Sequence, residues 1–150
     1  MDELRDLYQQ VILDHNKDPR NFGEIEPHSH DSEGYNPLCG DKIHIYLQVE
    51  DGVIKDVSFE GSGCAISKAS ASLMTTLLKG KTADEAQQLF RDFQKLITSE
   101  NDEMPDFEEI GKLSIFAGVK EFPTRVKCAA LAWHTMVAAL KNKVEPVTTE

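Results

Sequence analysis

Hydrophobic and polar positions at the start of the chain follow a helical pattern. Within residues 2–16 the apolar side chains recur at the spacing of one helix face, at Leu4, Leu7, Tyr8, Val11 and Ile12. Pro19 limits this helix, because the residue before a proline avoids helical backbone geometry. Residues 22–38 are rich in Gly, Pro, Asp, Ser and His, so we expect a long loop there with room for one short strand.

The pattern then changes to alternation. Residues 43–49 place an aliphatic residue at every second position, which is typical of a strand with one buried face. Asp51 and Gly52 form a favoured two-residue turn. Residues 53–60 are therefore expected to return as the second strand of an antiparallel hairpin.

Helical spacing dominates the second half of the chain. We expect a helix over residues 64–79, with Gly80 as its C-terminal cap. Thr82 and Glu85 have the spacing of a capping box, which predicts the start of another helix. A last helix begins near Thr124, and its apolar stripe comprises Val126, Ala129, Ala130, Trp133, Val137 and Leu140.

The order of these elements indicates the fold class. Strands early and helices late favour an α+β fold, in which helices pack on one face of a small antiparallel sheet. The 150 residues contain no internal repeat, so we expect a single domain spanning residues 1–150. The tail after Lys143 is expected to be frayed.

Composition narrows the classes of function. The net charge is −10 without a basic block, which argues against nucleic-acid binding, because phosphate contacts need clustered Lys and Arg. No apolar run approaches the roughly 20 residues that span a membrane. The acidic residues 1–6 do not resemble a secretory signal. We therefore expect a cytoplasmic protein, in which thiols stay reduced.

Three cysteines lie in three separate local settings. Cys39 lies in a turn between a proline and a glycine, Cys64 follows Gly-Ser-Gly at a predicted helix start, and Cys128 lies in the first turns of the last helix, off its apolar stripe. Helix N-termini favour thiolates through unpaired N–H groups and the helix dipole, so we expect accessible, activated thiols. The odd count favours metal binding or thiol chemistry. The alternative is three small buried apolar side chains.

Asp41 provides a fourth ligand for a metal site. It lies two residues after Cys39, and zinc accepts both thiolate sulfur and carboxylate oxygen in tetrahedral geometry. Lys42, Arg125 and Lys127 are positioned in the sequence to offset the negative charge of such a site. No Cys-x-x-Cys spacing is present, so the residue types alone leave both a shared metal site and unrelated cysteines open.

The histidines are the competing ligands. Their positions favour ordinary roles in a solvated loop, on a polar strand face or within helices, for His15, His28, His30, His44 and His134.

Five segments match a known family pattern. They are LYQQVILDH at 7–15, PRNFG at 19–23, NPLCGD at 36–41, GSGCAIS at 61–67, and RVKC at 125–128 followed by Trp133. Together they resemble the SufU branch of the IscU/NifU N-terminal family of iron–sulfur cluster assembly proteins, over nearly the whole chain. The resemblance implies a small antiparallel sheet flanked by helices.

The resemblance also implies a site and partners. It implies that Cys39, Asp41, Cys64 and Cys128 converge and bind Zn²⁺. It implies a pyridoxal-phosphate cysteine desulfurase of the SufS type as partner, with Cys39 as the catalytic thiol that accepts persulfide sulfur. Thiolate attack on the outer sulfur of a persulfide is closely related to disulfide exchange. The protein would then act as a sulfurtransferase that supplies downstream iron–sulfur assembly proteins.

Departures from the IscU pattern favour the SufU branch. IscU-type scaffolds have a histidine just before the third cysteine, where this chain has Lys127, and their Leu-Pro-Pro-Val-Lys run is absent. The alternative function is a scaffold for a transient iron–sulfur cluster, because thiolates bind both zinc and such clusters. The role of Arg125 stays open between orienting a ligand, contacting the desulfurase and merely facing solvent.

Overall fold

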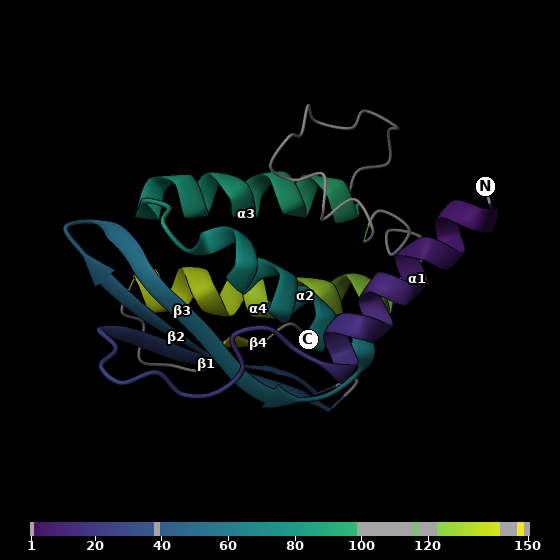
Figure 1. The fold of residues 1–150 in the computed structure, drawn as a ribbon, viewed down its shortest axis with the longest axis horizontal. Coiled ribbons are helices and arrows are strands. Elements are labelled where there is room, and N and C mark those ends of the chain that lie inside the picture. Colours follow the sequence, from purple (N-terminus) through teal and green to yellow (C-terminus); the bar gives the residue numbers. More distant parts are fainter. Residues whose placement is uncertain (1, 38–39, 99–115, 117–122, 142–146, 149–150) are drawn as a thin grey trace.

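The computed structural model describes residues 2–37, 40–98, 116, 123–141 and 147–148 (Figure 1). In chain order its elements are α1 (Asp2–Lys17), β1 (His30–Asn36), β2 (Asp41–Glu50), β3 (Val53–Ser62), α2 (Ala65–Leu78), α3 (Ala83–Thr98), α4 (Pro123–Leu140) and β4 (Val147–Thr148).

The sheet has the strand order β3-β2-β1-β4. The predicted hairpin of β2 and β3 is confirmed, and β1 adds to it as a further antiparallel strand. Strand β1 is the one short strand that was expected within residues 22–38. The expectation of a frayed tail was wrong for Val147 and Thr148, because β4 pairs in parallel with β1. Backbone pairing to a distant strand leaves no local sequence signal in so short a segment.

Helices cover one face of this sheet, as predicted (Figure 1). Helices α2 and α4 pack against the strands, α3 packs on α4, and α1 packs on α2. The largest fully buried side chains come from both layers and include Ile43, Ile45, Leu47, Phe59, Phe93 and Trp133. The α+β class is therefore confirmed. Within the described residues, no helix is both long and apolar enough to cross a membrane.

Local signals in the sequence account for several element ends. Asp51 and Gly52 have positive φ angles of 53° and 76°, as the hairpin turn requires. The Thr82 N–H donates to Glu85 Oε1 at 3.0 Å, and the Glu85 N–H donates to Thr82 Oγ1 at 3.1 Å. This pair of bonds is the predicted capping box at the start of α3.

Strand β1 lies unusually close to α4, and Gly34 makes this approach possible. A Cβ atom at position 34 would collide with Thr135 Oγ1 and lie 3.0 Å from Leu131 Cδ1. Asn36 follows Gly34 on the same buried face of β1. Cys128 precedes Leu131 and Thr135 on the same side of α4, because residues three and four apart share a helix face. The close packing therefore brings Asn36 against Cys128.

A buried hydrogen-bond chain connects α2 to α4 next to this contact. Ser70 Oγ donates to the Ala129 carbonyl oxygen at 2.6 Å, and Trp133 Nε1 donates to Ser70 Oγ at 3.1 Å. These bonds satisfy polar groups inside the core and help to hold the two helices at a fixed spacing.

Candidate metal centre

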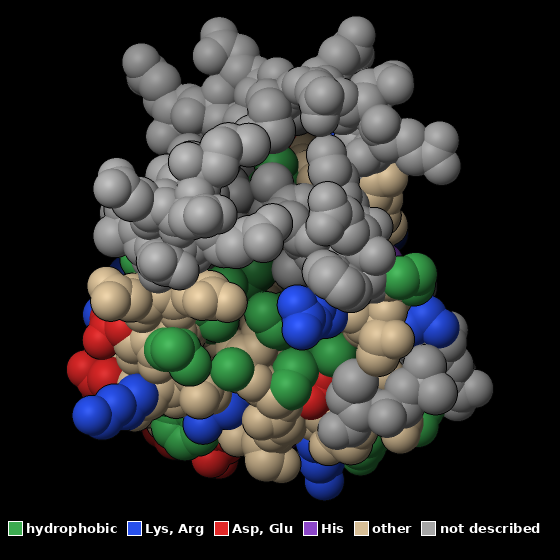
Figure 2. Space-filling view, turned by 90° about the vertical axis from the view of Figure 1, so that its right-hand side faces the viewer, with side chains coloured by type: hydrophobic (Ala, Val, Ile, Leu, Met, Phe, Trp, Pro, Cys, Tyr) green, Lys and Arg blue, Asp and Glu red, His purple; other side chains and the backbone are tan. Residues whose placement is uncertain are grey.

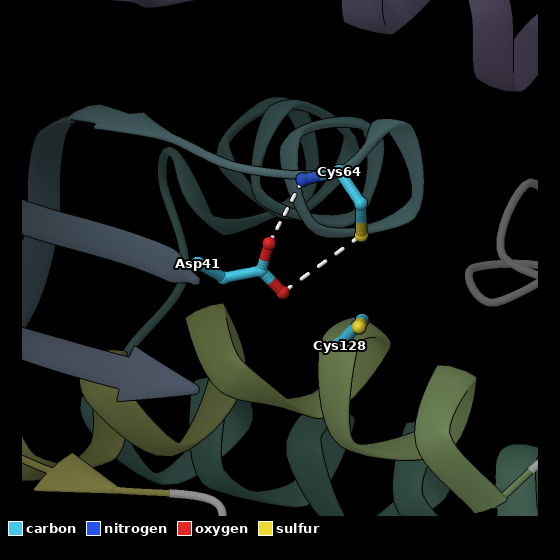
Figure 3. A group of neighbouring side chains, drawn as sticks. All are labelled: Asp41, Cys64 and Cys128. Carbon is cyan, nitrogen blue, oxygen red and sulfur yellow. Dashed lines mark hydrogen bonds between the residues drawn. The ribbon is translucent and has the colours of Figure 1, made fainter. Parts of the chain in front are cut away.

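Three of the four predicted ligands converge at one end of the sheet. Asp41 is the first residue of β2, Cys64 is the N-cap of α2, and Cys128 lies in α4 (Figure 3). One ligand atom from each of the three side chains lies within 4.8 Å of the others. The fourth predicted ligand, Cys39, lies outside the described residues.

Asp41 is held by the start of α2. Its side chain is 1% exposed, and its Oδ1 accepts the Cys64 backbone N–H at 2.8 Å. Its Oδ2 lies 3.8 Å from Cys64 Sγ (Figure 3). Gly63 makes room for this carboxylate, because a Cβ at position 63 would collide with Asp41 Oδ1. The φ angle of Gly63 is +148°, which L side chains rarely adopt.

Cys64 is half-buried and caps its own helix. Its Sγ accepts the Ser67 backbone N–H at 3.4 Å. Burial raises the pKa of the Cys64 thiol, and the Ser67 N–H offsets this only in part. The N–H groups at the helix start favour the thiolate as expected, but loss of solvation outweighs them, so the expectation of an activated Cys64 thiol was wrong for the metal-free protein.

Cys128 is buried, with 2% of its surface exposed. Its Sγ accepts an N–H from Asn36 Nδ2 at 3.4 Å. The sequence pattern predicted an accessible thiol off the apolar stripe of its helix, and this was wrong. Helix α4 is covered on almost all sides, so the consecutive residues 128–133 are all buried, and a single stripe does not describe its buried surface.

The donor set fits a zinc ion. Zinc takes sulfur ligands at about 2.3 Å and oxygen ligands at about 2.0–2.2 Å, so the edges of its coordination tetrahedron measure about 3.5–3.8 Å. The distance of 3.8 Å between Asp41 Oδ2 and Cys64 Sγ is close to such an edge. Asp41, Cys64 and Cys128 therefore offer one oxygen and two sulfur donors, all within 4.8 Å of one another.

The cationic residues occupy different positions around this group. Arg125 is exposed and Lys127 half-buried, both near the N-terminal end of α4. Lys42 follows Asp41 in β2, so its side chain points to the opposite face of the sheet. Its Nζ lies 5.6 Å from the centre of the Tyr35 ring. Lys42 is therefore not positioned to offset the charge of the site.

Two of the histidines are bound into the structure more tightly than the sequence predicted. His15 is buried and its Nδ1 lies 2.7 Å from Ser72 Oγ, which connects α1 to α2. His44 is half-buried, and its Nε2 lies 2.7 Å from Asp31 Oδ2. The local sequence patterns around His15 and His44 did not predict these hydrogen-bond partners.

The remaining histidines also lie apart from the three converging ligands. His134 lies edge-on to the Phe90 ring, and burial lowers its pKa. His28 lies near Glu24 and Glu26, which together form a second group of potential ligand atoms. Both of these carboxylates are exposed.

Two residues of the centre were missed by reasoning from the sequence. Asn36 lies inside the first cysteine motif and Gly63 directly precedes Cys64. Both positions were quoted as parts of motifs, but only the structure shows what each one contacts.

Comparisons with known proteins show the family to which the chain belongs. The family model of the NifU-like N-terminal domain matches residues 7–129. The chain is 41% identical over 143 residues to the iron–sulfur cluster assembly scaffold protein IscU of Thermotoga maritima, covering 93% of this chain and 96% of the relative. It is 39% identical over 133 residues to the zinc-dependent sulfurtransferase SufU of Bacillus subtilis, covering 89% and 88%.

A solved structure shows the same fold. It is that of a protein assigned as an iron–sulfur cluster assembly scaffold for the SUF system of Fervidobacterium islandicum, with a TM-score of 0.81 and 36% sequence identity. The match covers 87% of this chain and 94% of that protein. The sequence match and the shared fold agree, and the chain belongs to the family of NifU-like N-terminal domains.

Proposed function

We propose that this protein acts in iron–sulfur cluster assembly as a zinc-dependent sulfur acceptor, a sulfurtransferase that takes persulfide sulfur from a SufS-type cysteine desulfurase. The observation that carries this proposal is the convergence of Asp41, Cys64 and Cys128 from three separate elements. The 39% identity to a protein named zinc-dependent sulfurtransferase supports it.

In this proposal Asp41, Cys64 and Cys128 hold Zn²⁺ together with Cys39. The position of Cys39 in the sequence, two residues before Asp41 and between β1 and β2, supports its inclusion. Bound zinc would keep its thiolate ligands deprotonated at neutral pH and lower their nucleophilicity.

The environments of the thiols support unequal roles. Cys64 and Cys128 each accept an N–H hydrogen bond, and Cys128 is buried. Pro37 and Gly40, on either side of Cys39, are exposed. We therefore assign Cys64 and Cys128 as retained ligands and Cys39 as the thiol that reacts.

The transfer step is an exchange at sulfur. The Cys39 thiolate attacks the outer sulfur of the desulfurase persulfide and forms a new S–S bond. The original S–S bond breaks, and the desulfurase cysteine leaves as a thiolate with that electron pair. Cys39 now holds the persulfide, and no external oxidant or reductant is needed.

The surface around the centre supports a protein partner. Figure 2 shows one end of the molecule, on which apolar side chains lie among Lys, Arg, Asp and Glu side chains. A mixed apolar and polar surface is typical of non-obligate protein interfaces. We propose that the desulfurase approaches the end of the molecule where β2 and α2 begin, because Asp41 and Cys64 lie there.

A second function is favoured by a different observation. The chain is 41% identical to a protein named iron–sulfur cluster assembly scaffold, and thiolates bind clusters as well as zinc. In this alternative the same side chains hold a transient cluster. Metal analysis of protein purified without oxygen separates the two functions: zinc without visible absorption supports the acceptor, and stoichiometric iron and sulfide support the scaffold.

The acceptor function is tested by desulfurase turnover. We expect the wild-type protein to stimulate a SufS-type desulfurase and Cys39→Ala to abolish the stimulation. Ser62→Ala is the control, because Ser62 is exposed at the end of β3 near the centre. Full stimulation by the Cys39→Ala variant would contradict the acceptor role of Cys39.

A further inference from the structure

We propose that Asn36 is a positioning residue of the metal centre, whose side-chain N–H holds the Cys128 sulfur in its ligand position and lowers the nucleophilicity of that sulfur. Cys128 thereby stays a retained ligand and does not compete with Cys39 for sulfur. The inference rests on the proposed zinc site.

The first support is the contact itself. Asn36 is 0% exposed at the end of β1, and its Nδ2 lies 3.4 Å from Cys128 Sγ. An amide N–H bonds more strongly to a thiolate than to a neutral thiol, because bonds to ionised acceptors are stronger. The bond therefore strengthens when Cys128 becomes a metal ligand. Partners that bond to ligands in this way orient them and tune the metal.

The second support is the remainder of the Asn36 side chain. Its Oδ1 atom is buried and has no hydrogen-bond partner within the described part of the chain. A buried carbonyl oxygen without a partner costs stability, whereas an apolar side chain of the same shape would avoid that cost. Packing alone therefore does not explain an asparagine here. The N–H group that Asn36 donates to Cys128 Sγ explains the presence of an asparagine at this position.

The third support is how the fold places Asn36. It pairs with Asp41 across β1 and β2, and Cys39 lies between these two residues in the sequence. Gly34 allows β1 to lie against α4, which carries Cys128. The backbone thus holds the Asn36 amide in a position set by the two elements that also supply ligands.

Both described thiols share this feature. Cys64 Sγ accepts the Ser67 backbone N–H at the same distance, 3.4 Å, at which Cys128 Sγ accepts the Asn36 N–H. Cys64 receives its donor from the start of its own helix. Cys128 lies inside a helix, where backbone N–H groups are used in intrahelical bonds, and the Asn36 side chain of β1 supplies a donor from another element.

The test replaces Asn36 by Leu, which has a similar volume, and by Ala, which is small enough to be accommodated. Ser32→Ala is the matched control, since Ser32 is buried on the same face of β1 and its Oγ has no partner among the described residues. Three quantities are measured: the Zn²⁺ dissociation constant by chelator competition, the sulfur-to-metal charge-transfer band with Co²⁺, and the rate of Cys128 alkylation in the zinc-loaded protein, mapped by mass spectrometry.

We expect both Asn36 variants to bind Zn²⁺ about 10–100-fold more weakly, as is typical for loss of a partner that orients a ligand. The Co²⁺ band shifts, Cys128 is alkylated faster relative to Cys64, and Ser32→Ala changes none of these. Folded Asn36 variants with an unchanged band and an unchanged alkylation ratio would overturn the inference. Loss of the fold in both variants would also overturn it, because Asn36 would then be a structural residue. Failure of the wild-type protein itself to bind Zn²⁺ or Co²⁺ would instead overturn the proposed function.

Discussion

Asn36 and Asp41 pair directly across β1 and β2, and their side chains reach two different cysteines. Asn36 Nδ2 donates to Cys128 Sγ, and Asp41 Oδ1 accepts the Cys64 N–H. One pair of strand ends thus connects the beginning of α2 to the first turns of α4. The geometry of the centre therefore depends on the sheet as much as on the helices that carry the thiols.

Asp41→Ala is expected to weaken zinc binding by more than about 100-fold, because it removes a proposed ligand and not only a partner of a ligand. It also removes the acceptor of the Cys64 N–H. The Zn²⁺ dissociation constant from chelator competition measures the effect. Asp56→Ala in β3 is the control, since Asp56 forms an exposed ion pair with Lys79. Equal affinities of the two variants would remove Asp41 from the ligand set.

Gly63→Ala is expected to lower both stability and zinc affinity, because its Cβ would displace the Asp41 carboxylate. Gly80→Ala is the matched control: Gly80 also has a positive φ, +90°, but a Cβ there meets nothing within 4 Å. Both variants should lose about 1 kcal/mol of unfolding free energy from backbone strain. Only Gly63→Ala should change the Zn²⁺ dissociation constant. Identical metal affinity in both variants would show that Gly63 does not shape the site.

Gly34→Ala is expected to lower the unfolding free energy by about 1–3 kcal/mol, the usual cost of overpacking a core. The added methyl group would collide with Thr135 Oγ1 in α4. Thr135→Ala removes that oxygen, so the double variant should lose less stability than the sum of the two single variants. Urea denaturation of the four proteins measures this coupling. Strict additivity would contradict the close packing of β1 on α4.

Thr82→Ala is expected to cost about 1 kcal/mol of stability through loss of the helix cap, without an effect on zinc binding.

The capping box also predicts a pH dependence. The Thr82 N–H lowers the pKa of Glu85 below its ordinary value of 4.5. This contribution is fully present above that value and is lost as the pH falls through the lower folded-state pKa. Thermal melts at neutral and acidic pH should show a smaller loss of stability on acidification for Glu85→Gln than for the wild type.

Removal of the metal is expected to lower the melting temperature, because metal binding contributes to folding free energy.

The metal-free protein should also respond differently to alkaline pH. Burial raises the pKa of Cys64, so the native state holds this proton more tightly than the unfolded chain. The resulting stability is present below the ordinary pKa of 9.0 and is lost as the pH rises through the folded-state pKa. Melting temperatures of zinc-loaded and chelator-treated protein, measured over a series of pH values, would reveal this loss of stability. A melting temperature that does not respond to chelation would argue against a metal with a structural role.

The local sequence alone predicted those elements that depend on residues close together in the chain. Alternation over residues 43–49 predicted β2, Asp51 and Gly52 predicted the turn, and Thr82 with Glu85 predicted the start of α3. The cysteine motifs also indicated the right family and singled out Asp41, because the residue types that bind a metal are visible without a structure.

The tertiary structure decided what surrounds each candidate ligand that it describes. Cys128 is buried because the sheet, α2 and α3 all pack around α4. Its hydrogen-bond partner Asn36 is 92 residues away in the sequence. The pairing of β4 with β1 is similarly distant, and periodicity within one segment carries no information about such partners. Residue types and spacing therefore indicated candidate donors, whereas burial, hydrogen bonds and relative reactivity depend on contacts that form only when the whole chain packs.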